Sequence, residues 1–293
     1  GGVAVFDGSQ GVEPQSETVW RQADKYDVPR IAFVNKMDKT GGDFYMSLAS
    51  IHDRLSKDAV AIQLPIGEEG DFNGMVDLVE KKAYLFSGVH GEIIEEVPIP
   101  ADLEQNVNEY RATLMEKVAE CDDDLLDAYL TNGALTDEEL INGLRKGTVS
   151  GKLYPVLCGS SLKNVGVQKV LDAVVAYLPC PLDIGSIKGV KPDSEEVVER
   201  RPSNDEPMSA LAFKIATDPY VGKLTFVRVY SGVLKSGSHI INATRDGKER
   251  IGRIVKMHAN SREEVQEIQA GDIAAVIGLK DTRTGDTLCD IGQ

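Results

Sequence analysis

The chain has 293 residues and a formal net charge of −15, with 47 Asp and Glu against 32 Lys and Arg. This acidic excess argues against a general nucleic-acid binder, because such proteins present basic surfaces to phosphate groups. The length allows two or three domains.

The cysteine spacing and the length of the longest apolar run predict the cellular location of the protein. The four cysteines lie far apart and form no Cys-x-x-Cys pair, which predicts reduced thiols in a cytoplasmic protein and no metal site. The run Ile273–Leu279 is too short to cross a bilayer, so we expect no membrane partner. The chain opens without Met and directly on an apolar strand, which suggests a fragment of a longer protein.

Two apolar runs joined by a helical segment come first. Val3–Phe6 is short and continuously apolar, as expected for a parallel strand that is covered on both faces. A helix is predicted from about Pro14, which suits a first helical position, and it ends at Val28-Pro29. The run Arg30–Val34 then completes a β–α–β unit, which we expect to be right-handed.

The polar residues Asn35, Lys36 and Asp38 follow the second strand, where parallel sheets meet their ligands. A carboxylate only accepts hydrogen bonds, so Asp38 can take the N1–H and the exocyclic amine of guanine, a donor pair that adenine lacks. Asn35 can donate to the base and tie neighbouring loops together, and the stem of Lys36 can lie along the base plane. Taken alone, the motif Asn35–Asp38 is explained equally well by a strand end followed by a helix whose N-cap is Asp38 or Thr40.

The segment from about 65 to 151 indicates an α+β insertion within an α/β domain. Short strands separated by Gly-containing turns predict a small antiparallel sheet. These strands are expected at Val60–Leu64, Met75–Val79, Ala83–Phe86 and Glu92–Val97. A helical block follows from Ala101 to about Gly147, and Thr136-Asp-Glu-Glu139 is a capping box that opens its last helix.

This helical block is acidic, notably at Asp122–Asp124 and Glu138-Glu139. A solvated surface, with carboxylates favoured near helix N-termini, accounts for these charges and is the favoured interpretation. The functional alternative is a docking surface for a basic partner.

A second strand-end loop strengthens the guanine interpretation. Leu153–Leu157 returns to the parallel-strand pattern, and an amphipathic helix over Val167–Leu178 follows the loop. In that loop, main-chain N–H groups at Ser160 and Ser161 can donate to a guanine carbonyl oxygen. Two strand-end loops with complementary chemistry are much less expected by chance than one.

The last third of the chain has a different pattern. Residues 185–204 are polar, charged and contain Pro, which indicates a linker. Over 205–293 the apolar period becomes two, which predicts an all-β barrel domain. Asp246-Gly247 lies between Ile240-Ile241 and Ile251–Met257, a strong hairpin signal.

Long stretches of this sequence closely resemble bacterial translation elongation factor G. They are Phe6–Tyr26, Asn35–Asp38, Gly159–Lys163, Tyr177–Asp183, Phe213–Pro219 and Gly271–Asp281. The resemblance covers nearly the whole chain. It implies part of a P-loop-type GTPase domain over 1–184, with its insertion, followed by the β-barrel domain of translation factors.

The resemblance also implies which residues contact GTP or GDP. Asn35 and Asp38 read the guanine, Lys36 covers the base, and Ser160–Leu162 form the second base-contacting loop. The family usually has Ala where Ser161 stands, and a main-chain N–H contact survives that change.

The sequence lacks the motifs that handle phosphates. There is no Gly-x-x-x-x-Gly-Lys-Ser/Thr loop, which cradles phosphates and supplies the hydroxyl for Mg²⁺. The family's switch threonine and Asp-x-x-Gly segment are also absent, and in the family all three precede the part that corresponds to Val3. We therefore expect the guanine end of the site here, no catalytic residue, and no GTPase activity from this section alone. The Mg²⁺ ligands are expected elsewhere in the full-length protein.

The ribosome is the partner that the resemblance implies, with the acidic insertion against the stalk protein and the barrel against small-subunit rRNA. Candidate phosphate contacts are Arg228, Lys248, Arg250 and Arg253. Because the family's missing strands lie beside Val3–Phe6, that strand is expected to be an edge that self-associates. The alternatives are a non-catalytic ribosome-binding module and a section of a sibling GTPase, such as a release factor or a ribosomal protection protein.

Overall fold

The first 35 residues form the predicted β–α–β unit. It consists of β1 (Gly2–Asp7), α1 (Pro14–Lys25) and β2 (Arg30–Asn35), and the two strands pair in parallel. As predicted, Pro14 is the first helical residue. The computed structural model describes residues 1–191, 194–219, 222–258 and 261–291.

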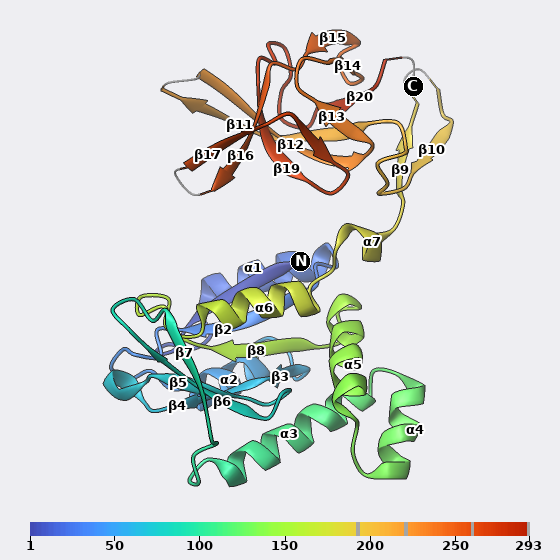
Figure 1. Cartoon of the computed structure of the whole chain (residues 1–293). Helices are drawn as coiled ribbons and strands as arrows, with labels where there is room; N and C mark the ends of the chain where they lie inside the picture. The colour runs from blue at the N-terminus through green and yellow to red at the C-terminus, as the bar shows by residue number, and fades with distance from the viewer. Residues whose placement is uncertain (192–193, 220–221, 259–260, 292–293) are drawn as a thin grey trace. The chain divides into compact units, whose positions relative to one another are not determined.

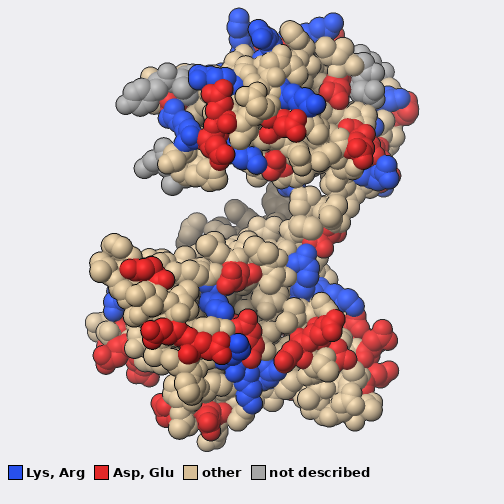
Figure 2. Space-filling model, in the orientation of Figure 1, with Lys and Arg blue, Asp and Glu red and all other residues tan. Residues whose placement is uncertain are grey.

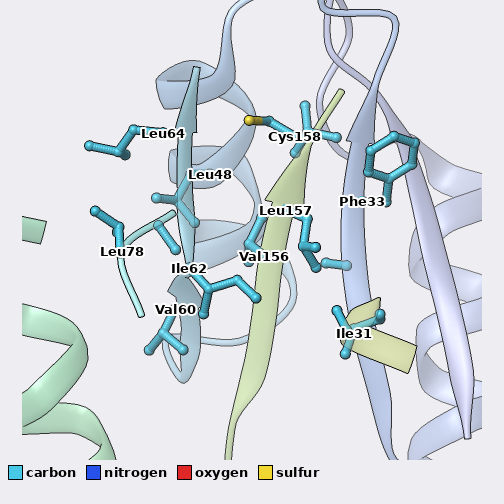
Figure 3. Close-up of a cluster of buried hydrophobic side chains, with 14 of the residues drawn as sticks. Ile31, Phe33, Leu48, Val60, Ile62, Leu64, Leu78, Val156, Leu157 and Cys158 are labelled. Carbon is cyan, nitrogen blue, oxygen red and sulfur yellow. The ribbon is translucent and has the colours of Figure 1, made fainter. Parts of the chain in front are cut away.

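A four-stranded parallel sheet, in the order β1-β2-β8-β3, is the centre of the first compact unit, Gly1–Pro179 (Figure 1). β3 is Ala59–Ala61 and β8 is Tyr154–Cys158. The apolar residues of β2 are all buried because both faces of the strand are covered. Figure 3 shows side chains of the sheet and of α2 (Phe44–Arg54) in one core, among them Ile31, Phe33, Leu48, Val156 and Leu157.

The run predicted as one strand, Val60–Leu64, is divided between two sheets, so that prediction was wrong. Its first residues pair with β8, whereas β4 (Gln63–Ile66) begins the antiparallel sheet of the insertion. Ile62 lies at the junction, where its N–H donates to the Val156 carbonyl at 3.0 Å and its carbonyl accepts from Leu78 at 2.9 Å. An apolar run has no period that reveals where a strand changes its partner.

The insertion contains the predicted antiparallel sheet, with the strand order β4-β5-β6-β7. Its further strands are β5 (Gly74–Asp77), β6 (Lys82–Ser87) and β7 (Ile93–Val97), and a 3₁₀ turn at Glu69–Asp71 precedes them. The helical block consists of α3 (Glu104–Ala119), α4 (Asp123–Asn132) and α5 (Asp137–Val149).

The predicted capping box opens α5. The Thr136 hydroxyl accepts a hydrogen bond from the Glu139 N–H at 3.3 Å, and the Glu139 carboxylate accepts from the Thr136 N–H at 2.8 Å. Two N–H groups that have no partner within the helix are thereby satisfied. α6 (Val167–Tyr177) also follows the prediction and buries Val170, Ala173 and Tyr177.

β1 lies at the edge of the parallel sheet, because the described residues provide no neighbour for it besides β2. Val3 and Val5 are 39% and 58% exposed, and with Val19 they line an apolar hollow of about 300 Å³ beside that edge. Unpaired main-chain groups next to apolar side chains favour pairing with another chain. The self-association expected through Val3–Phe6 stays a prediction that this geometry favours.

Sedimentation velocity tests this prediction. We expect the sedimentation coefficient to rise with protein concentration, and Val5→Lys to shift the chain toward monomer because a charge on an edge strand opposes pairing. Val175→Lys is the matched control, since Val175 is 82% exposed on α6 and does not line the hollow. A monomer at every concentration would contradict the prediction.

The second compact unit, Cys180–Gln293, opens with structure in the range where we expected a linker, 185–204. A short helix, α7 (Pro181–Ile184), precedes an antiparallel hairpin of β9 (Ile187–Val190) and β10 (Val197–Arg200). An exposed two-stranded hairpin needs few buried apolar residues. Its polar composition therefore resembles that of a linker, which is why the hairpin was not predicted.

The rest of this unit is all β, as predicted (Figure 1). An eight-stranded antiparallel sheet has the order β15-β14-β20-β11-β12-β19-β16-β17, and β13 and β18 form a separate pair. Alternate residues of the strands enclose an apolar core, which is the origin of the period of two. The strands are β11 (Ser209–Asp218), β12 (Gly222–Ser231), β13 (Val233–Lys235), β14 (His239–Asn242), β15 (Gly247–Arg250), β16 (Arg253–His258), β17 (Ser261–Val265), β18 (Glu267–Gln269), β19 (Ile273–Ile277) and β20 (Thr287–Cys289).

The hairpin turn at Asp246-Gly247 is confirmed, but its returning strand differs from the predicted one. β14 pairs with Gly247–Arg250, whereas the apolar run Ile251–Met257 mostly forms β16 and pairs with β17 and β19. β15 was missed because it is polar. The buried side chain on it is Glu249, whose carboxylate accepts hydrogen bonds from the N–H groups of the loop after β19.

The four cysteines, Cys121, Cys158, Cys180 and Cys289, are free thiols, and burial raises the pKa of three of them, Cys121, Cys158 and Cys289. None of the described helices is long and apolar enough to cross a membrane.

Candidate functional site

Parallel pairing brings the two predicted loops to one edge of the sheet. β8 lies beside β2 with Val34 opposite Cys158, so the residues after each strand are neighbours. On the other side of β2, the register places Asp7 opposite Asn35. Three strand ends therefore meet where ligands of parallel sheets bind.

Asn35 ties the two loops together, as the sequence predicted. Its Nδ2 donates to the Ser161 hydroxyl at 2.9 Å, and its Oδ1 accepts from the Ser161 N–H at 2.8 Å. The same Oδ1 accepts from the Lys36 N–H at 2.8 Å. One amide side chain thus fixes both loops against each other across 126 residues of sequence.

Lys36 turns the chain at the end of β2. Its φ of 64° lies in the left-handed region, which non-glycine residues adopt rarely. The turn directs Met37 into the core, where it is 1% exposed and its N–H donates to the Gly159 carbonyl at 3.1 Å. The buried Met37 anchors the polar residues on either side of it.

Asp7 is a member of the site that sequence reasoning missed. The Lys36 ammonium donates to its Oδ2 at 2.7 Å, and Lys39 lies 3.8 Å from the same oxygen. The hydrogen bond from Lys36 holds the pKa of the Asp7 carboxyl well below its usual range, and the pKa of Lys36 is raised in turn. Its position at the end of the strand beside β2 was the available signal.

Asp38 keeps its acceptor oxygens available. Its side chain is half-buried, and no described residue donates a hydrogen bond to its carboxylate or forms an ion pair with it. The cap of the following helix is Asp43, whose carboxylate accepts from the Met46 N–H at 3.0 Å. The N-cap alternative for Asp38 and Thr40 was therefore wrong.

The second loop differs from the prediction in which N–H groups are available. The Ser160 N–H donates to the Val165 carbonyl at 2.9 Å, and its hydroxyl accepts from the Lys163 N–H at 3.2 Å. Ser160 is fully buried and closes the loop, so its N–H does not face a ligand. Leu162 is 88% exposed, and its N–H makes no hydrogen bond to the described residues.

Gly159 is required by the close approach of its neighbours. A Cβ at this position would lie 2.5 Å from the Val165 carbonyl oxygen and 2.8 Å from the Phe33 ring. Its N–H also donates to the Val34 carbonyl at 2.9 Å. The loop can pack this closely against β2 because glycine has no side chain.

The strand ends of the first unit carry side chains that donate and accept hydrogen bonds. No group of three or more His, Cys, Asp or Glu among the described residues is arranged to hold a metal ion. Asp38 can accept two hydrogen bonds, and the Leu162 N–H of the second loop has no partner among the described residues.

Comparisons with known proteins show the family to which this chain belongs. The sequence model of the family described as "Elongation factor Tu GTP binding domain" matches residues 1–180, and that described as "Elongation factor Tu domain 2" matches residues 222–289. A similar solved structure is that of ttk003000868 from Thermus thermophilus, at 27% identity and a TM-score of 0.82. The similarity covers 100% of this chain and 40% of the Thermus protein.

Proposed function

Because this chain belongs to the translational GTPase family defined by the elongation factor Tu GTP-binding domain, we propose that it is the guanine-reading section of an elongation factor G-type GTPase. A protein of that type drives translocation on the ribosome in the cytoplasm. The observation that carries the proposal is the pair of loops locked by Asn35 and Ser161 beside the unpartnered Asp38 carboxylate.

Base selection follows from the donors and acceptors of this pair of loops. Asp38 accepts the N1–H and the exocyclic amine of guanine, and the Leu162 N–H donates to the guanine carbonyl oxygen. Asn35 and Ser161 keep their hydrogen bonds to each other and hold the two loops in place around the base. Adenine presents an amine where guanine has its carbonyl and has no N1–H, so it leaves both sides unpaired.

The aliphatic stem of Lys36 covers one side of the base. Its ammonium is held away from the base by Asp7, at 2.7 Å. This ion pair keeps the charged end at the surface, where 53% of the Lys36 side chain is exposed. Ser160 supports the loop from below without contacting the nucleotide.

The acidic insertion is the proposed docking surface for a basic ribosomal partner. Residues 65–151 contain 20 Asp and Glu against six Lys and Arg, which is nearly the whole charge excess of the chain. Figure 2 shows acidic side chains gathered on one face of the first unit. Such a field favours fast association with a basic protein.

From residue 180 onward the chain has sixteen Lys and Arg against seventeen Asp and Glu, so the barrel unit has almost no net charge. Of the two units it therefore repels the phosphates of RNA less. Of the four candidate cations, Arg253 lies 3.7 Å from Glu264 and Arg228 lies over the Tyr230 ring. Lys248 and Arg250 form no ion pair with the described residues. We assign rRNA phosphate contacts to these two residues of β15 first.

Calorimetric titration with GDP, and with ADP as the control, tests the proposed function. Without a phosphate-binding loop we expect GDP to bind no better than about 1 mM, roughly 4 kcal/mol, and ADP to bind not at all. Micromolar or tighter GDP binding would overturn this account, because such affinity requires contacts to the phosphates and this sequence contains no phosphate-binding loop.

No GDP binding would favour the second candidate, a non-catalytic ribosome-docking module. The observation behind that candidate is the charge of the insertion, which does not depend on the base-reading loops. A section of a sibling translational GTPase would give the same titration as elongation factor G, since both read guanine with the same loops.

A further inference from the structure

Two turns of the insertion contact the two base-reading loops from outside. The first turn, residues 67–71, lies between β4 and β5 and contains the 3₁₀ turn Glu69–Asp71. The second turn, residues 88–92, joins β6 to β7. Neither turn carries a residue that reads the base in the proposed recognition, so these contacts act on the loops and not on the ligand.

The Glu69 carboxylate reaches the loop that follows β2. Its Oε1 accepts a hydrogen bond from the Gly41 N–H at 2.7 Å. Over residues 38–41, the other main-chain N–H with a described partner is that of Lys39, which donates to the Lys36 carbonyl of the same loop at 3.1 Å. Among the described residues, the bond to Glu69 is therefore the one that ties this stretch of main chain to another part of the fold.

The main chain at Glu69 suits glycine better than glutamate. Its φ of 47° lies in the left-handed region, which glycine adopts without steric cost. The turn is closed by main-chain bonds, in which the N–H groups of Asp71 and Phe72 donate to carbonyls within it at 2.9 and 3.1 Å. The turn itself therefore does not need a carboxylate at this position, whereas the Gly41 N–H does.

The second base-reading loop is held by both turns. The Asn164 Nδ2 donates to the His90 carbonyl at 2.9 Å. The Lys163 ammonium donates to the Gly70 carbonyl at 3.4 Å. A Cβ at Gly91 would lie 2.5 Å from the Lys163 carbonyl oxygen, so the second turn packs directly on the loop. The insertion thus supports the loops on either side of the proposed base site.

We propose that Glu69 is a positioning residue for guanine binding, through which the insertion holds the Asp38 carboxylate in place. Gly41 follows Asp38 within the same tight loop, so a free Gly41 N–H allows the main chain at Asp38 to move. A contact that fixes a loop before the ligand arrives lowers the cost of ordering it on binding. This inference rests on the proposed guanine recognition but concerns a residue outside both loops.

Ligand-observed NMR titration of the 293-residue chain with GDP tests this role. Glu69→Gly removes the carboxylate and suits the main chain, so we expect GDP to bind about threefold more weakly or worse, with a melting temperature no lower than that of the wild type. Glu69→Gln retains an acceptor oxygen and should keep most of the affinity. Glu68→Ala is the matched control, because it removes a carboxylate from the same turn that caps no N–H group.

The amide resonances of the protein provide a measurement that needs no nucleotide. In Glu69→Gly the Gly41 amide proton should move upfield, as expected for a lost hydrogen bond to a carboxylate, and the Asp38 amide resonance should move with it. Neither should move in Glu68→Ala.

Two results would overturn the proposal, namely wild-type GDP affinity in Glu69→Gly and an Asp38 resonance that does not respond to this substitution. A wild-type chain that binds no GDP would instead overturn the proposed function. The Gly41 and Asp38 resonances would then still decide whether Glu69 places the carboxylate.

Discussion

Replacing Asp38 by Asn is expected to change the base preference of the chain from guanine to xanthine. The carboxylate accepts two donors from guanine, whereas an amide donates one hydrogen bond and accepts one. Xanthine retains the N1–H but has a carbonyl in place of the exocyclic amine, so Asn matches it. Hydrogen bonds to a charged group contribute about 1.5–3 kcal/mol each, so GDP binding should fall at least tenfold.

Ligand-observed NMR with GDP and with xanthosine diphosphate measures this change at millimolar concentrations. Asp53→Asn is the control, since Asp53 is exposed on α2 and belongs to neither loop. The control should keep the guanine preference of the wild-type chain. A chain with Asp38→Asn that still prefers GDP would show that Asp38 does not read the base.

Gly159→Ala is expected to cause a large loss of stability in the first unit. The added methyl group would lie 2.5 Å from the Val165 carbonyl oxygen and 2.8 Å from the Phe33 ring, and both belong to packed structure. The loop must move away from β2, which breaks the bond between Met37 and Gly159 and separates the two base-reading loops. We expect the free energy of unfolding to fall by about 3 kcal/mol, near the upper end for overpacked sites.

Urea unfolding followed by Trp20 fluorescence reports on this unit alone. Trp20 is the single tryptophan of the chain and is 4% exposed in the core of the first unit. Gly70→Ala is the control, because a Cβ there meets no atom within 4 Å. Equal urea midpoints for Gly159→Ala and the wild-type chain would rule out the close packing described for this loop.

Much of the fold could be predicted from local patterns. The continuous apolar runs gave the strands β1, β2 and β8, and the capping box gave the start of α5 at its observed residue. The expectation that Val3–Phe6 is covered on both faces was wrong among the described residues, because Val3 and Val5 are exposed at the sheet edge. The period of two gave the all-β unit. These signals are local because each environment imposes its own pattern on neighbouring residues. A strand that is covered on both faces is continuously apolar, a strand that is covered on one face alternates, and a helix start carries capping residues.

The wrong predictions concern a segment that pairs with two different sheets and strands that are polar. Val60–Leu64 is one apolar run but serves two sheets, and β15 is a strand although it is polar. The hairpin within 185–204 is likewise exposed and polar. The first residues of Val60–Leu64 pair with a strand that is distant in sequence, whereas β15 and the hairpin of β9 and β10 pair with near neighbours but lack the apolar pattern of a strand.

By itself the sequence determined which polar groups follow the strand, a carboxylate, an amide and a lysine, and these are the groups on which the proposed guanine recognition depends. The tertiary structure decided which groups are free to take part in it. Parallel register placed Asp7 beside Lys36, and an antiparallel bridge within the second loop bound the Ser160 N–H to Val165. Asp38 was left without a partner among the described residues. Which donors and acceptors remain for a ligand depends on the contacts that folding has already satisfied.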